Sequence, residues 1–547
     1  MSNSAIDQNS NSAVPTLGRR QLLKGGIGVF GLVSIGTPLL EACGATSGSG
    51  GTEQHATVVL PDAISTLDPP LVNSINVAAG ERHTIESFVS LDSEGKVVPA
   101  LATSWDVKPD QVTWIMHLRK GVSFHDGSDW TAAVAKKNLD RYLGDPTKFP
   151  RAQSYGFIDR VEALDKHTLL IHTKAPNSGF INWMSYFALG FHSGAALDKY
   201  GDKIGLHGVG TGPFKVDHFT PNQELVMSRF AKYWGEQPKL EKLTLTTVPD
   251  ASSRVNMLET GQGQVSVAIQ PPQIPIVKKS NDMTLQSTPS VRMAFIGINS
   301  QNPLLTDVRV RKALNFAVDS AETLKNVLNG EGTLAQSVMP AIIPGYSEQT
   351  LYKYDPDAAK KLLDEAGWRV GPSGNREHDG QPVVLTLRTT DGHTPGDKLT
   401  CEAVQGYLSE VGIKTKILVL EQNDYFASLE DKSSISKTGL NYFAYGSSIV
   451  DPTHALGLLE GSWSNVNSIY ARYRNKEFDA AYDRMVHAVA DEAARNSAAA
   501  EAQSIAWDDA CWIFLFSLNY LVANVNSIKN VQISPNEFYN LDKARRV

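Results

Sequence analysis

The chain has 547 residues, a formal net charge of −7 and 41% hydrophobic residues. This length favours roughly three domains or lobes and leaves ample chain to bury a large core. The mildly acidic balance argues against a nucleic-acid-binding protein, which needs a basic face.

Residues 1–42 have the features of an export signal rather than of a folded domain. The pair Arg19-Arg20 precedes an uncharged apolar run over residues 25–40, and this pair resembles a twin-arginine signal. The run is short and broken by glycines and a proline, so it makes a poor membrane-spanning helix. It ends in "LLEAC", which resembles a lipobox except at Glu41. We therefore expect lipid attachment at Cys43, with residues 43–54 as a flexible Gly/Ser-rich tether.

Short apolar or alternating runs predict β-strands along the rest of the chain. They cover residues 56–61, 112–118, 167–173, 224–229, 242–248, 293–299, 383–389 and 415–420. Helical spacing of apolar residues, with cap signals at the ends, predicts helices between them. These helices cover residues 306–330, 355–367 and 398–412, and a long Ala-rich helical region covers 476–509. Alternation of helices and strands indicates α/β lobes.

The stretch "FHDG" places His125 beside Asp126, as a catalytic dyad or a metal site could. Asp126-Gly127 is, however, a turn signal. Neighbouring side chains on an extended segment also point apart, so the imidazole and the carboxylate rarely meet. We predict a structural turn.

Motifs of the common enzyme and metal sites are missing from the sequence. It has no Walker loop, no HExxH and no G-x-S-x-G elbow, and its thirteen histidines are scattered. We expect no catalytic residues, no metal site and no cofactor. Cys401 and Cys511 either form a disulfide in an exported protein or remain two buried thiols.

Four segments in the same order resemble the family 5 extracellular solute-binding proteins of ABC transporters, the oligopeptide, dipeptide and nickel group. They are "VPALATSWDV" with "TWIMHLRKGVSFHDGSDWTA", the segment that begins "GTGPFKVDHF", "FIGINSQNPLLTDVRVRKALNFAVD", and "GYSEQTLYKYDPDAAKKLLDEAGW". The resemblance covers nearly the whole chain after the tether. In this family "FHDG" is a structural turn.

The resemblance implies an α/β, two-lobed periplasmic-binding-protein fold (venus flytrap) of type II, cluster C, with an extra domain. We expect lobe I to comprise residues 55–84, 208–288 and 520–547. The extra domain would cover 85–207, and lobe II would cover 289–519. The implied function is capture of a peptide-like or other medium-sized solute between the lobes and its delivery to ABC permease subunits. The protein would be a monomer outside the cytoplasm, held at the cell membrane by its lipid anchor, without nucleic acid as a partner.

Peptide-binding members carry an acidic residue three positions before an Asp-Pro pair, where it contacts the ammonium group of the peptide. Here Asp451-Pro452 aligns with that pair, Tyr445 stands at the aromatic position and Ser448 at the acidic one. A serine cannot supply the counter-charge that a buried ammonium needs. We therefore expect weak binding of free peptides, unless another carboxylate, such as Asp451 or Asp68, takes the amine.

The remaining candidate ligand contacts are aromatic residues and a proline-rich loop. Tyr442, Phe443, Tyr445 and Trp463 either contact ligand or pack in the core, and Pro271 in "IQPPQIP" provides a rigid rim. Alternatives to a peptide-like ligand are an oligosaccharide or a metal chelate. An exported hydrolase is the alternative from another class of protein.

Overall fold

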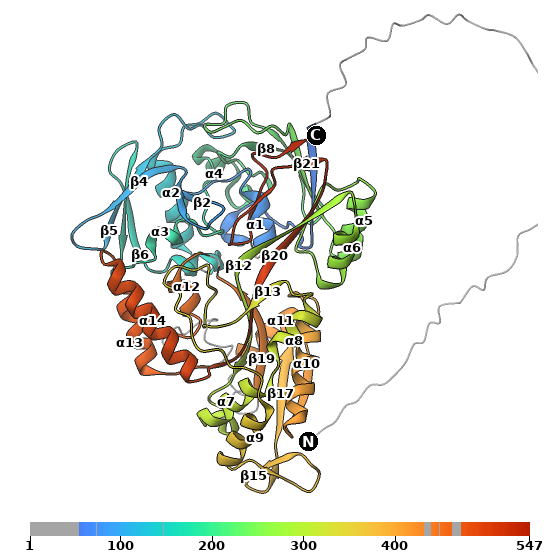
Figure 1. Ribbon diagram of the computed structural model, residues 1–547. Coiled ribbons are helices and arrows are strands. Elements are labelled where there is room, and N and C mark those ends of the chain that lie inside the picture. Colours follow the sequence, from blue (N-terminus) through green and yellow to red (C-terminus); the bar gives the residue numbers. More distant parts are fainter. Residues whose placement is uncertain (1–53, 73, 146, 431–438, 448, 462–471) are drawn as a thin grey trace, which may run out of the picture. The chain divides into compact units, whose positions relative to one another are not determined.

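The computed structural model describes residues 54–72, 74–145, 147–430, 439–447, 449–461 and 472–547 (Figure 1). The predicted export signal, Cys43, Ser448 and Trp463 lie outside the described residues. No helix in the described ranges has the length and apolar character needed to cross a membrane.

One large mixed sheet runs through the molecule, with two long strands at its centre. Its order is β18 (Lys414–Val419), β17 (Val384–Thr389), β19 (Leu440–Gly446), β12 (Met283–Ile298), β20 (Trp512–Val525), β11 (Val265–Val267), β1 (His55–Leu60), β10 (Lys242–Thr247), β9 (Glu224–Arg229) and β8 (Phe214–Thr220), with β13 (Gly332–Leu334) on β20. We call β8–β11 with β1 the first sheet half, and β17–β19 the second. Strands β12 and β20 run through both halves (Figure 1).

The antiparallel pairing of β12 with β20 is interrupted where the two halves meet. The register shifts between Pro289 and Met293, and Pro289 has no N–H to donate to a ladder. The Ser290 hydroxyl donates to the Leu518 carbonyl at this point, 3.0 Å away. Such irregularities bend a strand, so the chain changes direction here.

A separate four-stranded antiparallel sheet packs beside the first half, and both share one apolar core. Its strands are β4 (Ala102–Val107), β5 (Thr113–Leu118), β7 (Thr168–Thr173) and β6 (Ile158–Ala163), with β2 (Val89–Leu91) and β3 (Val97–Pro99) nearby in sequence. The helices of this region are α1 (Ile75–Glu81), α2 (Ala132–Gly144), α3 (Phe180–Trp183), α4 (Gly194–Tyr200), α5 (Ala251–Glu259) and α6 (Ile274–Lys279).

The "FHDG" stretch forms a turn, as predicted. Gly127 has φ +86°, and its N–H donates to the Phe124 carbonyl. His125 and Asp126 point to different partners: Nε2 of His125 lies 2.9 Å from the Gly212 carbonyl oxygen, whereas the Asp126 carboxylate accepts from Ser128 and Ser193.

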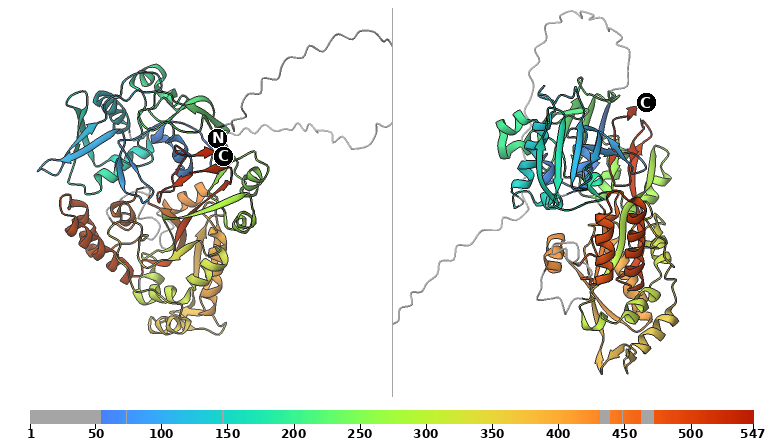
Figure 2. Two further views of the ribbon diagram at one scale, coloured as in Figure 1. Left: turned by 45° about the horizontal axis from the view of Figure 1, so that its top comes forward. Right: turned by 90° about the vertical axis from the view of Figure 1, so that its left-hand side faces the viewer.

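The helices predicted after residue 305 are present in the structure, with two corrections to their bounds. Residues 306–330 form not one helix but α7 (Val308–Ala317) and α8 (Ser320–Val327), because the Asp319 side chain caps a new helix by accepting from the Glu322 N–H. The region 476–509 likewise divides into α13 (Lys476–His487) and α14 (Glu492–Asp508), where Asp491 caps the second helix. These two helices lie side by side (Figure 2).

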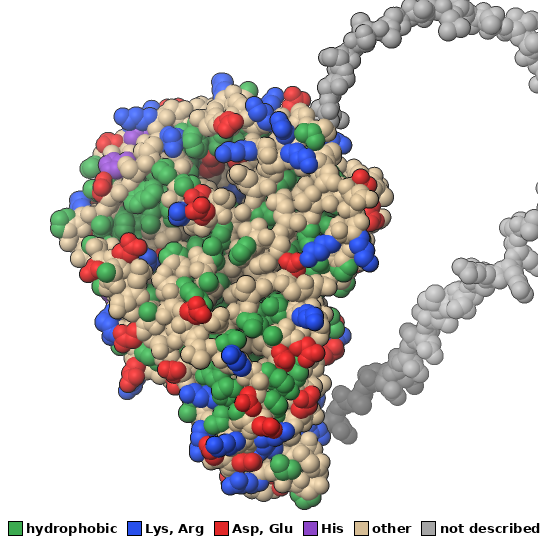
Figure 3. Space-filling model, viewed as in Figure 1, with side chains coloured by type: hydrophobic (Ala, Val, Ile, Leu, Met, Phe, Trp, Pro, Cys, Tyr) green, Lys and Arg blue, Asp and Glu red, His purple; other side chains and the backbone are tan. Residues whose placement is uncertain are grey.

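The second half and the C-terminal segment contain four further helices and several short strands in the described residues. They are α9 (Pro356–Glu365), α10 (Asp397–Glu410), α11 (Gln422–Glu430) and α12 (Pro452–Leu456), and the strands β14 (Arg369–Val370), β15 (Arg376–His378), β16 (Gln381–Pro382), β21 (Ile528–Lys529), β22 (Gln532–Ile533), β23 (Tyr539–Asn540) and β24 (Arg545–Arg546). Cys401 and Cys511 are buried in different apolar clusters and are free thiols. Acidic and basic side chains are interspersed over the face drawn in Figure 3.

Candidate ligand-binding cavity

A cavity of about 720 Å³ lies where β12 and β20 pass between the two sheet halves. Its walls come from the segment after β1, the start of α1, residues 268–274, the loop 392–395, the end of β19 and residues 536–537. A cavity of this volume suits a small ligand, since such pockets measure about 300–1,000 Å³. Both sheet halves therefore contribute to one cavity.

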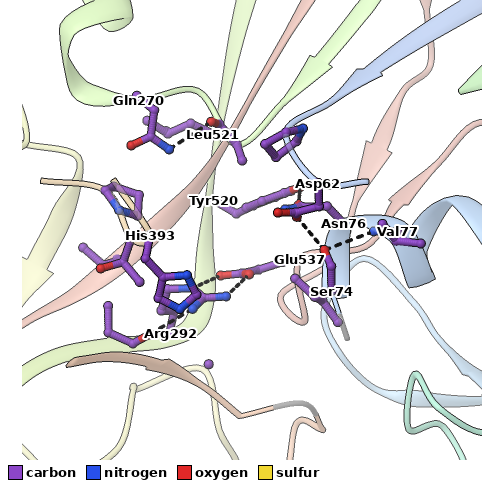
Figure 4. A pocket seen from close by; sticks show the side chains of 18 of the residues that line it. Asp62, Ser74, Asn76, Val77, Gln270, Arg292, His393, Tyr520, Leu521 and Glu537 are labelled. Carbon is purple, nitrogen blue, oxygen red and sulfur yellow. Dashed lines mark hydrogen bonds and ion pairs between the residues drawn. The ribbon is translucent and has the colours of Figure 1, made fainter. Parts of the chain in front are cut away.

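An ion pair between Arg292 and Glu537 forms part of the wall (Figure 4). The Nε and Nη2 atoms of Arg292 donate to the two carboxylate oxygens of Glu537 at 2.7 and 2.5 Å, and Nη1 donates to the Ala444 carbonyl at 2.9 Å. Two parallel charge-assisted hydrogen bonds hold both groups in a fixed orientation. The pair thus connects β12, the end of β19 and the C-terminal segment.

A network of polar side chains surrounds Asp62 in the first sheet half (Figure 4). Its Oδ2 atom accepts from the Ser74 hydroxyl at 2.5 Å and from the Asn76 amide at 2.8 Å. Tyr520, from β20, donates to Oδ1 of Asn76 at 2.6 Å. Ser74 also accepts from the Val77 N–H and so caps α1. The start of α1 is thereby tied to the carboxylate.

His393 contributes an imidazole from the loop before α10. Burial, and next the neighbouring Arg292 guanidinium, lower the pKa of His393 below its usual value. The ring is therefore neutral at neutral pH. It lies near Phe426 and Phe443, with ring centroids 6.1 and 6.5 Å away.

Residues 96–467 match the family described as bacterial extracellular solute-binding proteins, family 5 Middle. This chain belongs to that family. The glutathione-binding protein GsiB of Shigella dysenteriae serotype 1 is 31% identical over 523 residues, which cover 94% of this chain and 98% of that protein. GsiB of Escherichia coli strain K12 is 30% identical with the same coverage.

Solved structures of other binding proteins share the fold. NikA from Brucella suis, in complex with Fe(III)-EDTA, has a TM-score of 0.80 at 23% identity, covering 90% of this chain and all of that one. The dipeptide-binding protein from Pseudoalteromonas sp. SM9913, in complex with Met-Leu, has a TM-score of 0.76 at 19% identity and the same coverage. The expected type II periplasmic-binding-protein fold is confirmed. The lobe boundaries and the cluster assignment stay predictions.

Three of the predicted contact residues of this family 5 protein line the cavity: Phe443, Tyr445 and Pro271. Tyr442 does not belong to the described lining. Side chains alternate along a strand, so Tyr442 faces the apolar cluster under α7 and α10, whereas Phe443 faces the other side of β19. Ser448 and Trp463 lie outside the described residues.

The two carboxylates proposed as alternative amine partners are buried elsewhere. Asp68 pairs with Arg141 at 3.0 and 2.5 Å, and Asp451 pairs with Arg495 at 2.6 Å. Each is 1% exposed, and neither belongs to the described lining of the cavity. A buried carboxylate is stable only beside partners of this kind, so the structure gives both acids structural partners.

Asp62, Arg292 and His393 were not predicted from the sequence as residues of the site. For Asp62 a usable signal existed, because this residue directly follows the predicted strand over 56–61, and ligands of α/β proteins bind at the carboxyl ends of strands. Arg292 and His393 gave no local signal. Within the described ranges, no three His, Cys, Asp or Glu side chains converge as a metal site would require.

Proposed function

We propose that this family 5 protein captures a small peptide-like solute outside the cytoplasm and delivers it to an ABC permease. The supporting observation is the cavity of about 720 Å³ with walls from both sheet halves, because closing two halves over a ligand removes it from water. Its lining combines aromatic side chains with a few oriented polar groups, the usual composition of a small-ligand site. The extensive similarity to glutathione-binding proteins favours a peptide-like ligand.

We also propose that the protein binds its ligand without catalysing a reaction. Calorimetry on the purified protein against glutathione, dipeptides, tripeptides, oligosaccharides and nickel–histidine chelates tests the ligand class. We expect a peptide-like compound to bind with a Kd of about 10 μM or tighter and to be recovered unchanged by mass spectrometry. Binding of only an oligosaccharide or a chelate would overturn the ligand class, and turnover of any bound compound would overturn the non-enzyme proposal.

We also propose that the mature protein begins at Cys43 and acts as a lipid-anchored monomer. The basis is the "RRQLLK" and "LLEAC" sequence pattern, since a cysteine after such an apolar run is typical of exported lipoproteins. The Gly/Ser-rich residues after it would give the binding domain free movement near its permease.

A further inference from the structure

Asp62 offers a negative charge to the cavity, and no described cation is paired with it directly. Its side chain is partly exposed, and it belongs to the lining. Among the described residues, no Lys, Arg or His nitrogen lies within 4.0 Å of its carboxylate. Its hydrogen bonds come from the neutral donors Ser74 and Asn76, and both end on Oδ2. The carboxylate is therefore oriented while its charge remains available.

Arg292 of the cavity lining and Arg254 on α5 are both engaged with other groups. Arg292 is held by both oxygens of Glu537. Arg254 donates to the Val248, Pro249 and Ala268 carbonyls. Both guanidinium groups therefore have hydrogen-bond partners other than Asp62.

His393 and Arg151 are two further basic residues of the cavity lining. His393 is neutral at neutral pH, since its pKa is lowered by burial and by Arg292. Arg151 donates to the Val72 carbonyl, and its guanidinium lies over the Phe187 ring, 5.6 Å from the centroid. A ligand with its own cation is the natural partner for the Asp62 carboxylate.

We propose that Asp62 binds a primary ammonium group of the ligand and thereby selects solutes that carry one. This inference rests on the proposed function in that it takes the cavity as the ligand site. An ammonium group enclosed between protein walls needs a counter-charge to replace its hydration. Asp62 supplies the charge, and the network through Asn76 to Tyr520 links its orientation to the central strand β20.

Asp62→Asn is the discriminating variant because it removes the charge and keeps the shape. The amide oxygen of asparagine can still accept from Ser74 and Asn76, so the start of α1 keeps its support. Asp282→Asn is the matched control, since Asp282 is exposed and lies outside the described cavity lining.

The test measures the affinity of four probes by calorimetry for the wild type and both variants. The probes are glutathione, N-acetylglutathione, glucosamine and N-acetylglucosamine, so each ammonium compound has a neutral acetylated partner. We expect the wild type to prefer glutathione over its acetylated form. Asp62→Asn should weaken glutathione binding by about tenfold or more and leave the acetylated form unchanged, while Asp282→Asn should match the wild type.

Different results separate this inference from the proposed function. If glutathione and N-acetylglutathione bind equally, or if Asp62→Asn leaves glutathione affinity unchanged, the role of Asp62 is wrong and a peptide-like ligand stands. If only glucosamine binds, and Asp62→Asn abolishes its advantage over N-acetylglucosamine, the ammonium site stands and the peptide-like ligand is wrong. If neither ammonium probe binds, the inference is overturned.

Discussion

Asp451 and Arg495 form a buried ion pair in which Oδ2 of Asp451 accepts from Nη2 of Arg495 at 2.6 Å. The same oxygen accepts from the Asn182 amide at 2.7 Å. Asp451 precedes α12, Arg495 lies on α14 and Asn182 lies on α3. Through Ser178, which donates to the Met485 carbonyl and accepts from Arg495, this contact joins the region around α3 to helices α13 and α14.

Replacing Asp451 should therefore destabilise the protein strongly. We expect Asp451→Asn to lower the free energy of unfolding by about 3 kcal/mol, because the partly buried Arg495 would lose its counter-charge. The control is Glu501→Gln, which breaks the exposed pair between Arg484 and Glu501 on α13 and α14. That change should cost less than about 1 kcal/mol. Urea unfolding measures both, and equal losses would show that the buried pair has no special role.

Two tyrosines of β19 lie on opposite sides of the strand and test the place of the ligand site. Tyr445→Ala should weaken binding of the peptide-like ligand about tenfold, since it removes an aromatic wall of the cavity. Tyr442→Phe should leave affinity within about twofold, because that side chain faces the opposite side of the strand. Calorimetry with the tightest-binding peptide-like compound checks both. A greater loss for Tyr442→Phe would place the ligand elsewhere.

His125→Ala should alter stability and not binding. Burial lowers the pKa of His125 to about 4, so the ring is neutral at neutral pH and donates to the Gly212 carbonyl. Its loss should cost about 1 kcal/mol of unfolding free energy and change ligand affinity by less than about threefold. A hundredfold loss of affinity in a folded variant would return this histidine to the functional residues.

The buried carboxyl group of Glu86 should make the free energy of unfolding fall as pH rises towards neutrality. Burial raises its pKa to about 7, although hydrogen bonds from Trp234, Thr211 and Tyr233 oppose the shift. A raised pKa in the folded state stabilises at low pH, and this contribution is lost as pH rises from about 4.5 to 7. Burial also raises the pKa of nearby Asp542, which acts in the same direction.

The variant Glu86→Gln isolates the contribution of this carboxyl group to the pH dependence of stability. Between about pH 5 and pH 8, most of the interval between the unfolded-state and folded-state pKa values of Glu86 is covered. Over this range the free energy of unfolding of the variant should fall by about 2 kcal/mol less than that of the wild type. Guanidinium unfolding at several pH values gives the comparison. Parallel curves for the two proteins would show that Glu86 is ionised in the folded state throughout.

Cys43→Ala tests the proposed anchor. The wild type should partition into detergent and its mature N-terminus should map to Cys43, whereas the variant should be released from membranes. Fractionation and N-terminal mass spectrometry give the answer. A variant that remains membrane-bound, or a mature N-terminus at another residue, would contradict the lipoprotein proposal.

Local signals in the sequence were sufficient for features that depend on neighbouring residues. The turn at Asp126-Gly127 follows from a glycine that adopts positive φ. The start of α9 follows from Asp355, which caps the helix, and from Pro356 at its first position. The resemblance of four ordered segments was enough to indicate the family and its fold, because these segments span the chain.

Only the tertiary structure decided which polar side chains meet. Tyr520 contacts Asn76 across 444 positions of sequence, and Arg292 contacts Glu537 across 245, so no local pattern could pair them. Asp68 and Asp451 looked like ligand partners in the sequence, but folding brought Arg141 and Arg495 to them. Among the residues that the structure describes, the Asp62 carboxylate accepts only from the neutral donors Ser74 and Asn76. A carboxylate has the same chemistry in every sequence, and its role depends on which charges the fold places beside it.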